Sequence, residues 1–336
     1  MRAYQLIASN GPESLKLNQL GEPQPAPGQV LVRVHATSLN YRDLMVATGR
    51  YGAHVPLPLI PLSDGAGEIV AVGAGVTRWK AGDRVAGTFF QNWQGGAMRR
   101  DAFGSALGGA INGMLAEFVA LSADGVIAIP PHLSFEEAAT LPCAALTAWH
   151  ALVTSGNISA GQTVLVLGTG GVSIFALQFA KMHGARVIIT SSSDAKLARA
   201  KALGADETIN YRATPDWEKE VFRLTDKAGA DHVVEVGGTD TFPKSLRALA
   251  LGGTISVIGG VSGFTSEVPL GDILGKSAVI RGIYVGSHEM FSAMNRAVSL
   301  HQLKPVIDRA FPFSEAPAAY RHQESGAHFG KVVITV

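Results

Sequence analysis

Hydrophobic and polar residues follow two different patterns along this chain, and the pattern changes near residue 133. Before that point, apolar β-branched residues alternate with polar ones in short runs such as QVLVRVHATSL (29–39), and glycines and prolines separate the runs. This pattern predicts β-strands joined by tight turns, with a long glycine-rich loop over residues 91–113. The tail HFGKVVITV (328–336) returns to the strand pattern. We expect this tail to pair with strands from the first third of the chain.

From residue 133 onward, apolar residues recur at helical spacing between short β-branched runs. Ser134 followed by Glu137 has the form of a capping box, and Pro142 predicts a break in the helix that this box begins. Further along, TVLVLG and ARVIIT read as strands on either side of a helical segment, VSIFALQFAKMHG, and more strands follow in DHVVEVGG, GTISVIGG and AVIRGIYVG. Strands that alternate with helices in this way predict an α/β fold with a parallel, doubly wound sheet.

Length, charge and cysteine content restrict the classes of protein that the chain can form. Its 336 residues suggest about two domains, and 47% apolar residues are enough for a sizeable core. A net charge of +1 indicates neither a nucleic-acid partner nor an anionic membrane. The single cysteine excludes an intramolecular disulfide and a four-cysteine metal site. With no signal-peptide pattern and no apolar run of about 18 residues, we expect a soluble, cytoplasmic protein.

The most specific local motif is GTGGVS (168–173), which lies between a predicted strand and a predicted helix. Glycines in such a turn let the backbone approach a pyrophosphate, whose charge meets free N–H groups at the helix N-terminus. Ser173 replaces the third glycine of the usual motif. An ordinary glycine-rich turn is the alternative, but the flanking strand and helix favour a dinucleotide site. Its predicted cofactor-binding residues are Gly168, Thr169, Gly170, Gly171 and Val172.

The end of the next predicted strand indicates which nicotinamide cofactor fits. Sites that prefer NAD usually place Asp or Glu there, where the carboxylate binds the ribose hydroxyls. This strand ends in TSSS (190–193) instead, and hydroxyls with a nearby lysine can bind a 2′-phosphate that a carboxylate would repel. The pattern therefore favours NADPH. We interpret Asp194 as a helix N-cap, and the alternative for the lysine is a solvated helix face. The predicted 2′-phosphate residues are Ser191, Ser192, Lys196 and Tyr211.

The order of the motifs resembles the medium-chain dehydrogenase/reductase superfamily, and in particular its zinc-independent quinone oxidoreductase-like and alcohol dehydrogenase-like members. The motifs are PAPGQVLVRVHATSLNYRDL, PLSDGAGEIVAVGAGVTRWKAGDRV, LPCAALTAWHAL, GTGGVSIFALQFAK, VIGGVSG and GKVVI. The resemblance implies a GroES-like, β-rich catalytic domain (1–126 and 286–336) and a Rossmann NAD(P)-binding domain (127–285), with the active site in the cleft between them. It also implies a homodimer joined through a Rossmann edge strand, for which SAVIRGIYVG is the candidate.

Zinc-dependent relatives hold a catalytic metal with a cysteine, a histidine and a second cysteine. By resemblance, these three positions fall on Asn40, Ser63 and Cys143. A catalytic zinc needs about three protein ligands, and an amide and a hydroxyl cannot replace a thiolate and an imidazole. Asp64 beside the one thiol does not complete a set, so we predict no metal. Cys143 follows Pro142 in an apolar run, which provides no activating group for a nucleophile, and we expect a reduced, partly buried thiol.

Without a metal, hydrogen-bond donors must stabilise the negative charge that develops on the substrate oxygen. By resemblance to quinone oxidoreductases, Asn40 and Tyr51 line the nicotinamide and substrate pocket, and a tyrosine that some relatives carry falls on Met45 here. Tyr41 and Arg42 are alternative donors. The resemblance also places several residues against the cofactor, although a plain strand end is the alternative for the glycines. These residues are Thr147, Ile258, Gly259, Gly260, Val261 and Lys331.

These observations predict an NADPH-dependent oxidoreductase that transfers a hydride to a quinone, an α,β-unsaturated carbonyl or an aldehyde without zinc. One alternative is a protein that binds NADP with little or no catalysis. Another is an alcohol dehydrogenase working in the oxidative direction, which is disfavoured because no metal lowers the pKa of the alcohol.

Overall fold

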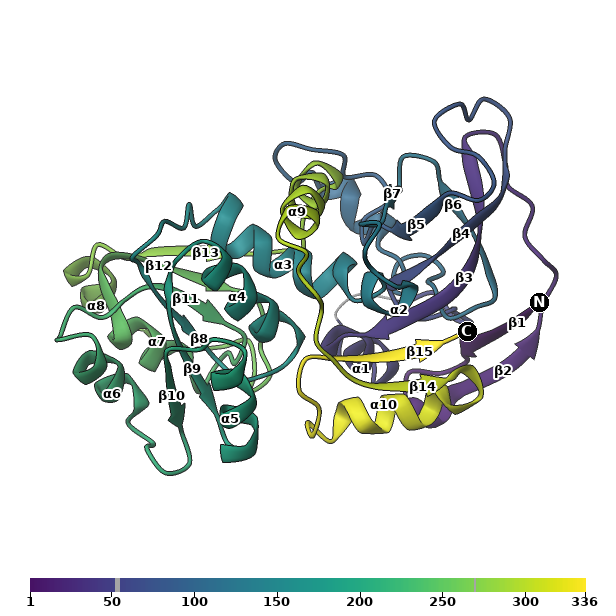
Figure 1. Ribbon diagram of the computed structural model, residues 1–336. Helices are drawn as coiled ribbons and strands as arrows, with labels where there is room; N and C mark the ends of the chain where they lie inside the picture. Colours follow the sequence, from purple (N-terminus) through teal and green to yellow (C-terminus); the bar gives the residue numbers. More distant parts are fainter. Residues whose placement is uncertain (52–54, 269) are drawn as a thin grey trace. The chain divides into compact units, whose positions relative to one another are not determined.

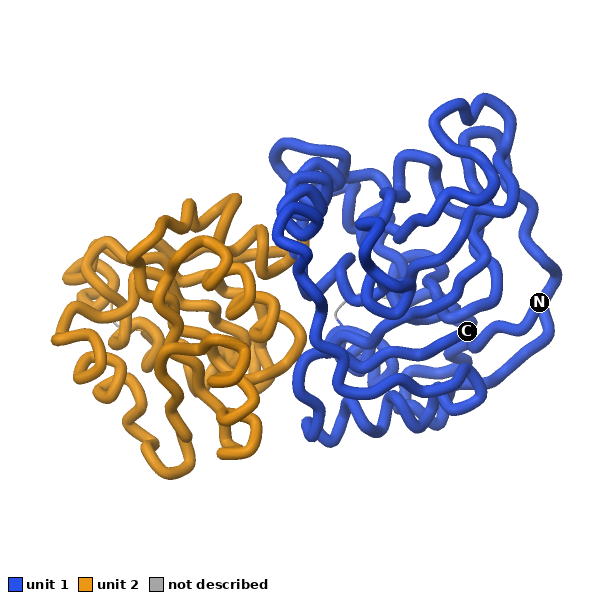
Figure 2. Tube along the Cα trace, viewed as in Figure 1, with its two compact units in different colours: residues 1–146, 286–336 blue, residues 147–285 orange. Residues whose placement is uncertain are grey.

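The computed structural model describes residues 1–51, 55–268 and 270–336. It divides into two compact units, which Figure 2 shows in different colours. Unit 1 comprises residues 1–146 and 286–336, and unit 2 comprises residues 147–285.

The two units meet after Leu146 and before Gly286, whereas the sequence places the domain boundaries after residues 126 and 285. Hydrogen bonds explain the shift. The hydroxyl of Ser38 donates to the carbonyl oxygen of Ala139, and the backbone N–H of Cys143 donates to Asp64. The segment that precedes the boundary is therefore part of unit 1.

Unit 1 is built around a seven-stranded sheet in the order β14, β15, β3, β4, β5 and β7, with β6 paired to β3. A separate ribbon pairs β1 with β2. Val332 of β15 pairs with Leu39 of β3, which confirms that the tail of the chain joins the N-terminal strands. The strands are β1 (Arg2–Leu6), β2 (Leu15–Gln19), β3 (Gln29–Leu39), β4 (Asp64–Val72), β5 (Arg84–Gly87), β6 (Phe118–Ser122), β7 (Val126–Ala128), β14 (Ile307–Pro312) and β15 (Lys331–Thr335).

The apolar core of unit 1 includes residues of this sheet, of the β1–β2 ribbon and of helices α1 and α10. Tyr320 of α10 and Val332 and Ile334 of β15 are fully buried in it. The helices of the unit are α1 (Tyr41–Ala47), α2 (Phe135–Ala138), α9 (His288–Leu300) and α10 (Ala316–Glu324), with short helical turns η1 (Pro12–Ser14), η2 (Arg100–Ser105), η3 (Leu141–Ala145) and η5 (Phe313–Glu315).

The helix predicted to begin at Ser134 does so, and it is interrupted at Pro142. The hydroxyl of Ser134 accepts the backbone N–H of Glu137, whose carboxylate accepts the N–H of Ser134, so the capping box is confirmed. Helix α2 ends at Ala138, and η3 begins at Leu141 with the proline in its first turn. A proline lacks the N–H that a continuous helix requires there. The helical run then continues through α3 (Leu146–Trp149) and η4 (His150–Thr154).

Unit 2 contains a six-stranded parallel sheet in the order β10, β9, β8, β11, β12 and β13, which confirms the predicted doubly wound fold. Helices α4 and α5 lie on one face of the sheet, and α6, α7 and α8 gather on the other (Figure 1). The strands are β8 (Thr163–Val166), β9 (Arg186–Ser191), β10 (Glu207–Asn210), β11 (Ala230–Glu235), β12 (Leu249–Val257) and β13 (Val279–Gly282). The helices are α4 (Gly171–Met182), α5 (Asp194–Ala202), α6 (Trp217–Leu224), α7 (Phe242–Ala248) and α8 (Leu270–Gly275).

The order of the strands reverses between β8 and β11, and ligands of open α/β sheets bind beyond the carboxyl ends of the strands at such a switch point. The connection that follows β8 is the GTGGVS turn. Among the helices of the described residues, none combines the length and the apolar character that a bilayer crossing requires.

Candidate functional site

The GTGGVS segment forms the predicted strand–turn–helix in unit 2. Gly168 has a φ of 72°, a backbone conformation that residues with a side chain rarely adopt. Gly170 is the N-cap of α4 and, being a glycine, provides no side-chain acceptor for the N–H groups of the first turn. The Ser173 hydroxyl donates to the carbonyl oxygen of Leu167 at 2.7 Å and ties the helix to the strand. The turn thus has the backbone geometry that a pyrophosphate requires.

The residues predicted to hold a 2′-phosphate lie together at the carboxyl ends of β9 and β10. Ser191 pairs with Asn210 in the sheet, and its carbonyl oxygen accepts the backbone N–H of Tyr211 at 3.1 Å. Lys196 follows in the first turn of α5, and the described chain places no carboxylate at the tip of β9 itself. The prediction that Asp194 is the N-cap is wrong. The N-cap is Ser193, whose hydroxyl accepts the N–H of Lys196, and Asp194 instead accepts a hydrogen bond from Asn210 at 2.7 Å.

A buried glutamate that the sequence analysis did not find organises the loops at the other strand ends. Glu235, at the end of β11, accepts the backbone N–H groups of Gly237 and Gly238 at 2.7 and 3.0 Å. Its own carbonyl oxygen accepts the N–H of Ile258 at 2.9 Å, at the start of the predicted segment 258–261. The signal was an acid at the end of an apolar strand before two glycines. Thr147, the remaining predicted residue of unit 2, lies in α3.

A buried polar cluster in unit 1 brings together residues from β3, β4 and β15. Lys331 is 2% exposed, and its Nζ donates to the carbonyl oxygen of Leu39 and to Oδ1 of Asn40, each at 2.6 Å. The same Nζ lies 3.8 Å from Oδ2 of Asp64, which is fully buried. The side-chain nitrogen of Asn40, Nδ2, is buried and has no hydrogen-bond partner among the described residues. This amide is therefore a donor that remains available inside the cluster.

Arg42 and Tyr51, two of the predicted catalytic candidates, are in contact. The Arg42 guanidinium lies 4.7 Å from the ring centres of both Tyr51 and Phe89, and its Nη1 donates to the carbonyl oxygen of Leu107 at 2.7 Å. Although burial lowers the pKa of Arg42, the neighbouring Tyr51 and Asp43 together hold that pKa above its ordinary value. Arg42 thus fixes the 91–113 loop against α1. Tyr41, another predicted catalytic candidate, is half-buried and packs against the apolar core of unit 1.

Asp43 completes the first turn of α1 and accepts the backbone N–H of Asn40 at 2.8 Å. Burial raises the pKa of its carboxyl to about 6, against the opposing effect of Arg42 and with a further contribution from Asp64. Tyr320 was not predicted, and its hydroxyl is buried with no partner in the described part of the chain. Burial, together with the charge of Asp43, raises the pKa of this hydroxyl.

The positions that hold zinc in metal-dependent relatives do not fit that metal here. Oδ1 of Asn40 already accepts from the ammonium of Lys331, and the Ser63 hydroxyl donates to Asp64 at 2.7 Å. Burial, reinforced by the Asp64 carboxylate, raises the pKa of the Cys143 thiol well above its usual range, so the thiolate that zinc requires is disfavoured. Within the described ranges, no three His, Cys, Asp or Glu side chains converge to hold a metal ion.

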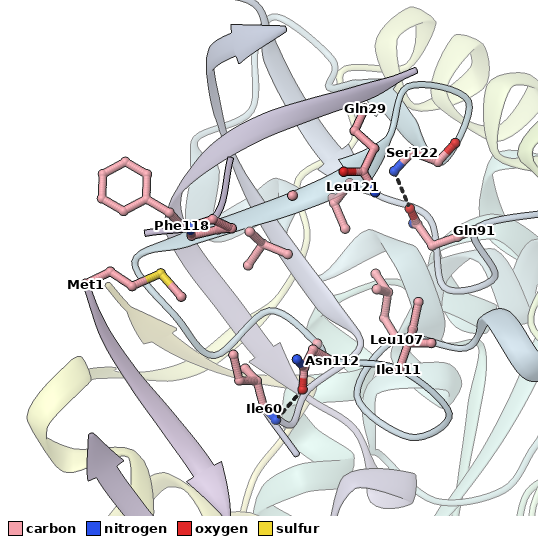
Figure 3. A pocket seen from close by; sticks show the side chains of 14 residues that line it. Met1, Gln29, Ile60, Gln91, Leu107, Ile111, Asn112, Phe118, Leu121 and Ser122 are labelled. Atoms are coloured by element: carbon pink, nitrogen blue, oxygen red, sulfur yellow. Dashed lines mark hydrogen bonds between the residues drawn. The ribbon is translucent and has the colours of Figure 1, made fainter. Parts of the chain in front are cut away.

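A cavity of about 470 Å³ lies in unit 1, but the polar cluster does not line it. Its wall is mostly apolar and comes from β6, the 107–113 segment and the N-terminus. Figure 3 shows two hydrogen bonds in this wall, from the Ser122 N–H to Gln91 and from the Ile60 N–H to Asn112. Leu107 connects the cavity wall with Arg42, because its carbonyl oxygen accepts a hydrogen bond from the Arg42 guanidinium.

The fold, the glycine-rich turn of unit 2 and the polar cluster of unit 1 define a class, the two-domain oxidoreductases that use a nicotinamide cofactor. The alcohol dehydrogenase GroES-like domain family matches residues 26–131, and the zinc-binding dehydrogenase family matches residues 171–299. The chain belongs to the medium-chain dehydrogenase/reductase superfamily and is an oxidoreductase of its quinone oxidoreductase-like and alcohol dehydrogenase-like members. The second match begins at residue 171, so its description does not bear on Asn40, Ser63 and Cys143.

Three similar proteins illustrate the relationship. A zinc-type alcohol dehydrogenase-like protein of Schizosaccharomyces pombe is 47% identical over 334 residues, which are 97% of this chain and 96% of that protein. The human quinone oxidoreductase is 30% identical and covers 99% of this chain and 97% of its own length. A crystal structure of an NAD-dependent alcohol dehydrogenase superposes with a TM-score of 0.90 at 38% identity, covering 100% of both chains.

Proposed function

We propose that the chain is a zinc-independent reductase that transfers a hydride from NADPH to a quinone, an α,β-unsaturated carbonyl or an aldehyde. The observation that carries the proposal is the Asn40 amide, which stands at a zinc-ligand position of the family. Its Oδ1 is occupied by Lys331, and its Nδ2–H is a buried donor without a partner among the described residues. Substrates of this class have an electron-poor carbon conjugated to an oxygen, so a hydrogen-bond donor suffices where a Lewis acid would otherwise act.

The residues of this chain account for the charges and protons of the reaction. The bound nicotinamide supplies the hydride. As the hydride adds to the electron-poor carbon, the π electrons of the substrate move to its oxygen, where Asn40 Nδ2–H stabilises the negative charge. We assign the proton that this oxygen then takes to the Tyr51 hydroxyl. The Tyr51 ring lies 4.7 Å from the Arg42 guanidinium, whose positive charge stabilises the phenolate that remains.

The preference for NADPH rests on this chain's own residues, because one similar structure is that of an NAD-dependent enzyme. Ser191 and Tyr211 meet at the carboxyl ends of β9 and β10, Ser192 follows Ser191, and Lys196 lies in the first turn of α5. Their hydroxyl and ammonium groups would suit a 2′-phosphate. Asp194, the nearest carboxylate in sequence, is held by Asn210.

Turnover of NADPH and NADH with a panel of quinones, enones and aldehydes tests the proposal. We expect oxidation of NADPH, in preference to NADH, with at least one of these classes. Binding of NADPH without oxidation by any substrate would contradict the proposal and favour a non-catalytic nucleotide-binding protein. Because several relatives are named alcohol dehydrogenases, the panel includes alcohols with NADP, and faster oxidation of an alcohol than reduction of its aldehyde would reverse the proposed direction.

We also propose that the chain forms a homodimer through β13, the edge strand of the unit 2 sheet. All four of its residues are exposed in the described chain, including the apolar Val279 and Ile280. An exposed apolar edge needs a partner or protection. Light scattering of the wild type should give twice the chain mass, and Ile280→Lys should give the monomer.

A further inference from the structure

We propose that Lys331 is a positioning residue, which holds the Asn40 amide in the orientation that presents Nδ2–H to the substrate oxygen. The inference rests on the proposed reductase function and replaces the expectation that Lys331 binds the cofactor. The reason for the change is that its ammonium lies within unit 1, where it is buried beside Leu39, Asn40 and Asp64.

The chemistry of an ammonium group fixes the orientation of the amide. A lysine ammonium has three N–H donors and no acceptor, so only an oxygen can face it at 2.6 Å. Asn40 must therefore turn Oδ1 towards Lys331, and Nδ2 points to the opposite side of the amide plane. Without this lysine the two ends of the amide would be nearly equivalent in size, and the orientation with Oδ1 towards the substrate would repel the developing oxyanion.

The charge of Lys331 also makes Asn40 a stronger donor. The ammonium that donates to Oδ1 draws electron density from the amide. Hydrogen bonds in a chain also strengthen one another in a low-dielectric interior. Asp64 balances this charge from 3.8 Å and is itself held by the Ser63 hydroxyl and the Cys143 N–H, at 2.7 and 3.2 Å. The ammonium thus acts on the substrate oxygen through Asn40, which one end of β3 and the start of α1 hold in place.

The unpartnered Nδ2 explains why such an arrangement persists in a folded chain. A buried donor without an acceptor destabilises the folded chain, because the donor has lost its hydrogen bonds to water. A bound substrate oxygen removes this cost, and it does so most fully when the oxygen is negatively charged, as it is during hydride transfer. The cluster therefore favours the charged oxygen over the neutral ground state.

Four variants test the inference with a substrate that the wild type reduces. They are Lys331→Met, Lys331→Arg, Asn40→Ala and the double variant of Lys331→Met with Asn40→Ala. For each protein, kcat, KM and the Kd of NADPH are measured. We expect Lys331→Met to lower kcat about tenfold or more while the Kd of NADPH changes less than about twofold. Lys331→Arg, which keeps the charge and the donors, should recover most of the lost rate. In the Asn40→Ala background, Lys331→Met should have almost no further effect on kcat.

Three results would overturn the inference. The first is a rise in the Kd of NADPH with kcat unchanged, which would make Lys331 a cofactor ligand. The second is an equal loss of kcat from Lys331→Met with and without Asn40. The third is unimpaired kcat in Lys331→Met. Since that variant leaves Asp64 unbalanced, the charge-matched pair Lys331→Met with Asp64→Asn supplies the same comparison if the single variant fails to fold. A wild type that reduces no substrate of the panel refutes the proposed function and this inference together, whereas an active wild type with an unimpaired variant refutes only the inference.

Discussion

The glycine-rich turn of unit 2 and the Asn40 cluster of unit 1 are two sites built on different principles. The turn uses backbone N–H groups and a glycine with a φ of 72°, all within six consecutive residues. The cluster uses side chains from positions as far apart as Asn40 and Lys331, 291 residues along the chain. A backbone site depends on few side-chain identities, whereas a side-chain site can change its chemistry through single substitutions.

Substitution of Asn40 should change catalysis strongly and leave cofactor binding unchanged. Asn40→Ala should lower kcat by about 10²–10³-fold, because it removes the donor to the developing oxyanion. The Kd of NADPH should stay unchanged, since the turn of unit 2 is untouched. Steady-state kinetics and a fluorescence titration measure the two quantities. Asn18→Ala, an amide of the same unit that bonds to Gln5, is the matched control and should retain the wild-type kcat. Equal losses in both variants would remove Asn40 from the mechanism.

The pH dependence of stability probes the cluster without any substrate. Burial raises the pKa of Asp43 to about 6 in the folded protein, from an ordinary value of 3.8. The folded state therefore binds this proton more tightly than the unfolded state. The stability that the proton supplies is present below pH 4 and is lost as the pH rises through about 6. The free energy of unfolding should fall by up to about 3 kcal/mol over this interval. Asp43→Asn lacks this component, so its free energy of unfolding should change less between pH 4 and pH 7 when both proteins are unfolded in denaturant. An equal change in the two proteins would mean that the Asp43 carboxyl does not have the raised pKa.

Gly168→Ala tests whether the turn of unit 2 binds the cofactor. A left-handed backbone conformation costs a residue with a side chain roughly 1–2 kcal/mol. The Kd of NADPH should rise by about five- to thirtyfold, while kcat at saturating NADPH falls little. Gly271→Ala, at a glycine of α8 with open space around it, should leave the Kd as it is. A lower kcat with an unchanged Kd would mean that the turn acts in catalysis and not in binding.

The smallest effect concerns the choice between the two nicotinamide cofactors. A carboxylate at the tip of β9 should repel a 2′-phosphate and bind ribose hydroxyls. Ser192→Asp is expected to shift the ratio of kcat/KM for NADPH and NADH by about tenfold towards NADH, a change of about 1.4 kcal/mol. The same substitution at Ser193 is not equivalent, because that hydroxyl caps α5. An unchanged ratio would place the 2′-phosphate elsewhere.

The same difference between the two sites decides how much of each could be predicted from the sequence. Strand, turn and helix follow from local patterns, so the order of elements in unit 2 and the GTGGVS turn are confirmed. The surroundings of Asn40 do not follow from any local pattern, since Lys331 meets Asn40, and Asp64 meets Lys331, only through the pairing of β3 with β4 and β15. Phe89 contacts Arg42, and the charge of Asp43 acts on Tyr320, although each pair is far apart in the sequence. Asp194 was misread because Ser193 and Asp194 are both good capping residues, and only the backbone shows which one precedes the helix.

We propose that this chain reduces its substrate with the Asn40 amide in place of a zinc ion. The most direct test measures the zinc content and the rate of NADPH oxidation on one sample, before and after exhaustive chelation. We predict far less than one zinc per chain and the same rate in both states. A stoichiometric zinc whose removal abolishes the rate, and whose return restores it, would contradict the claim.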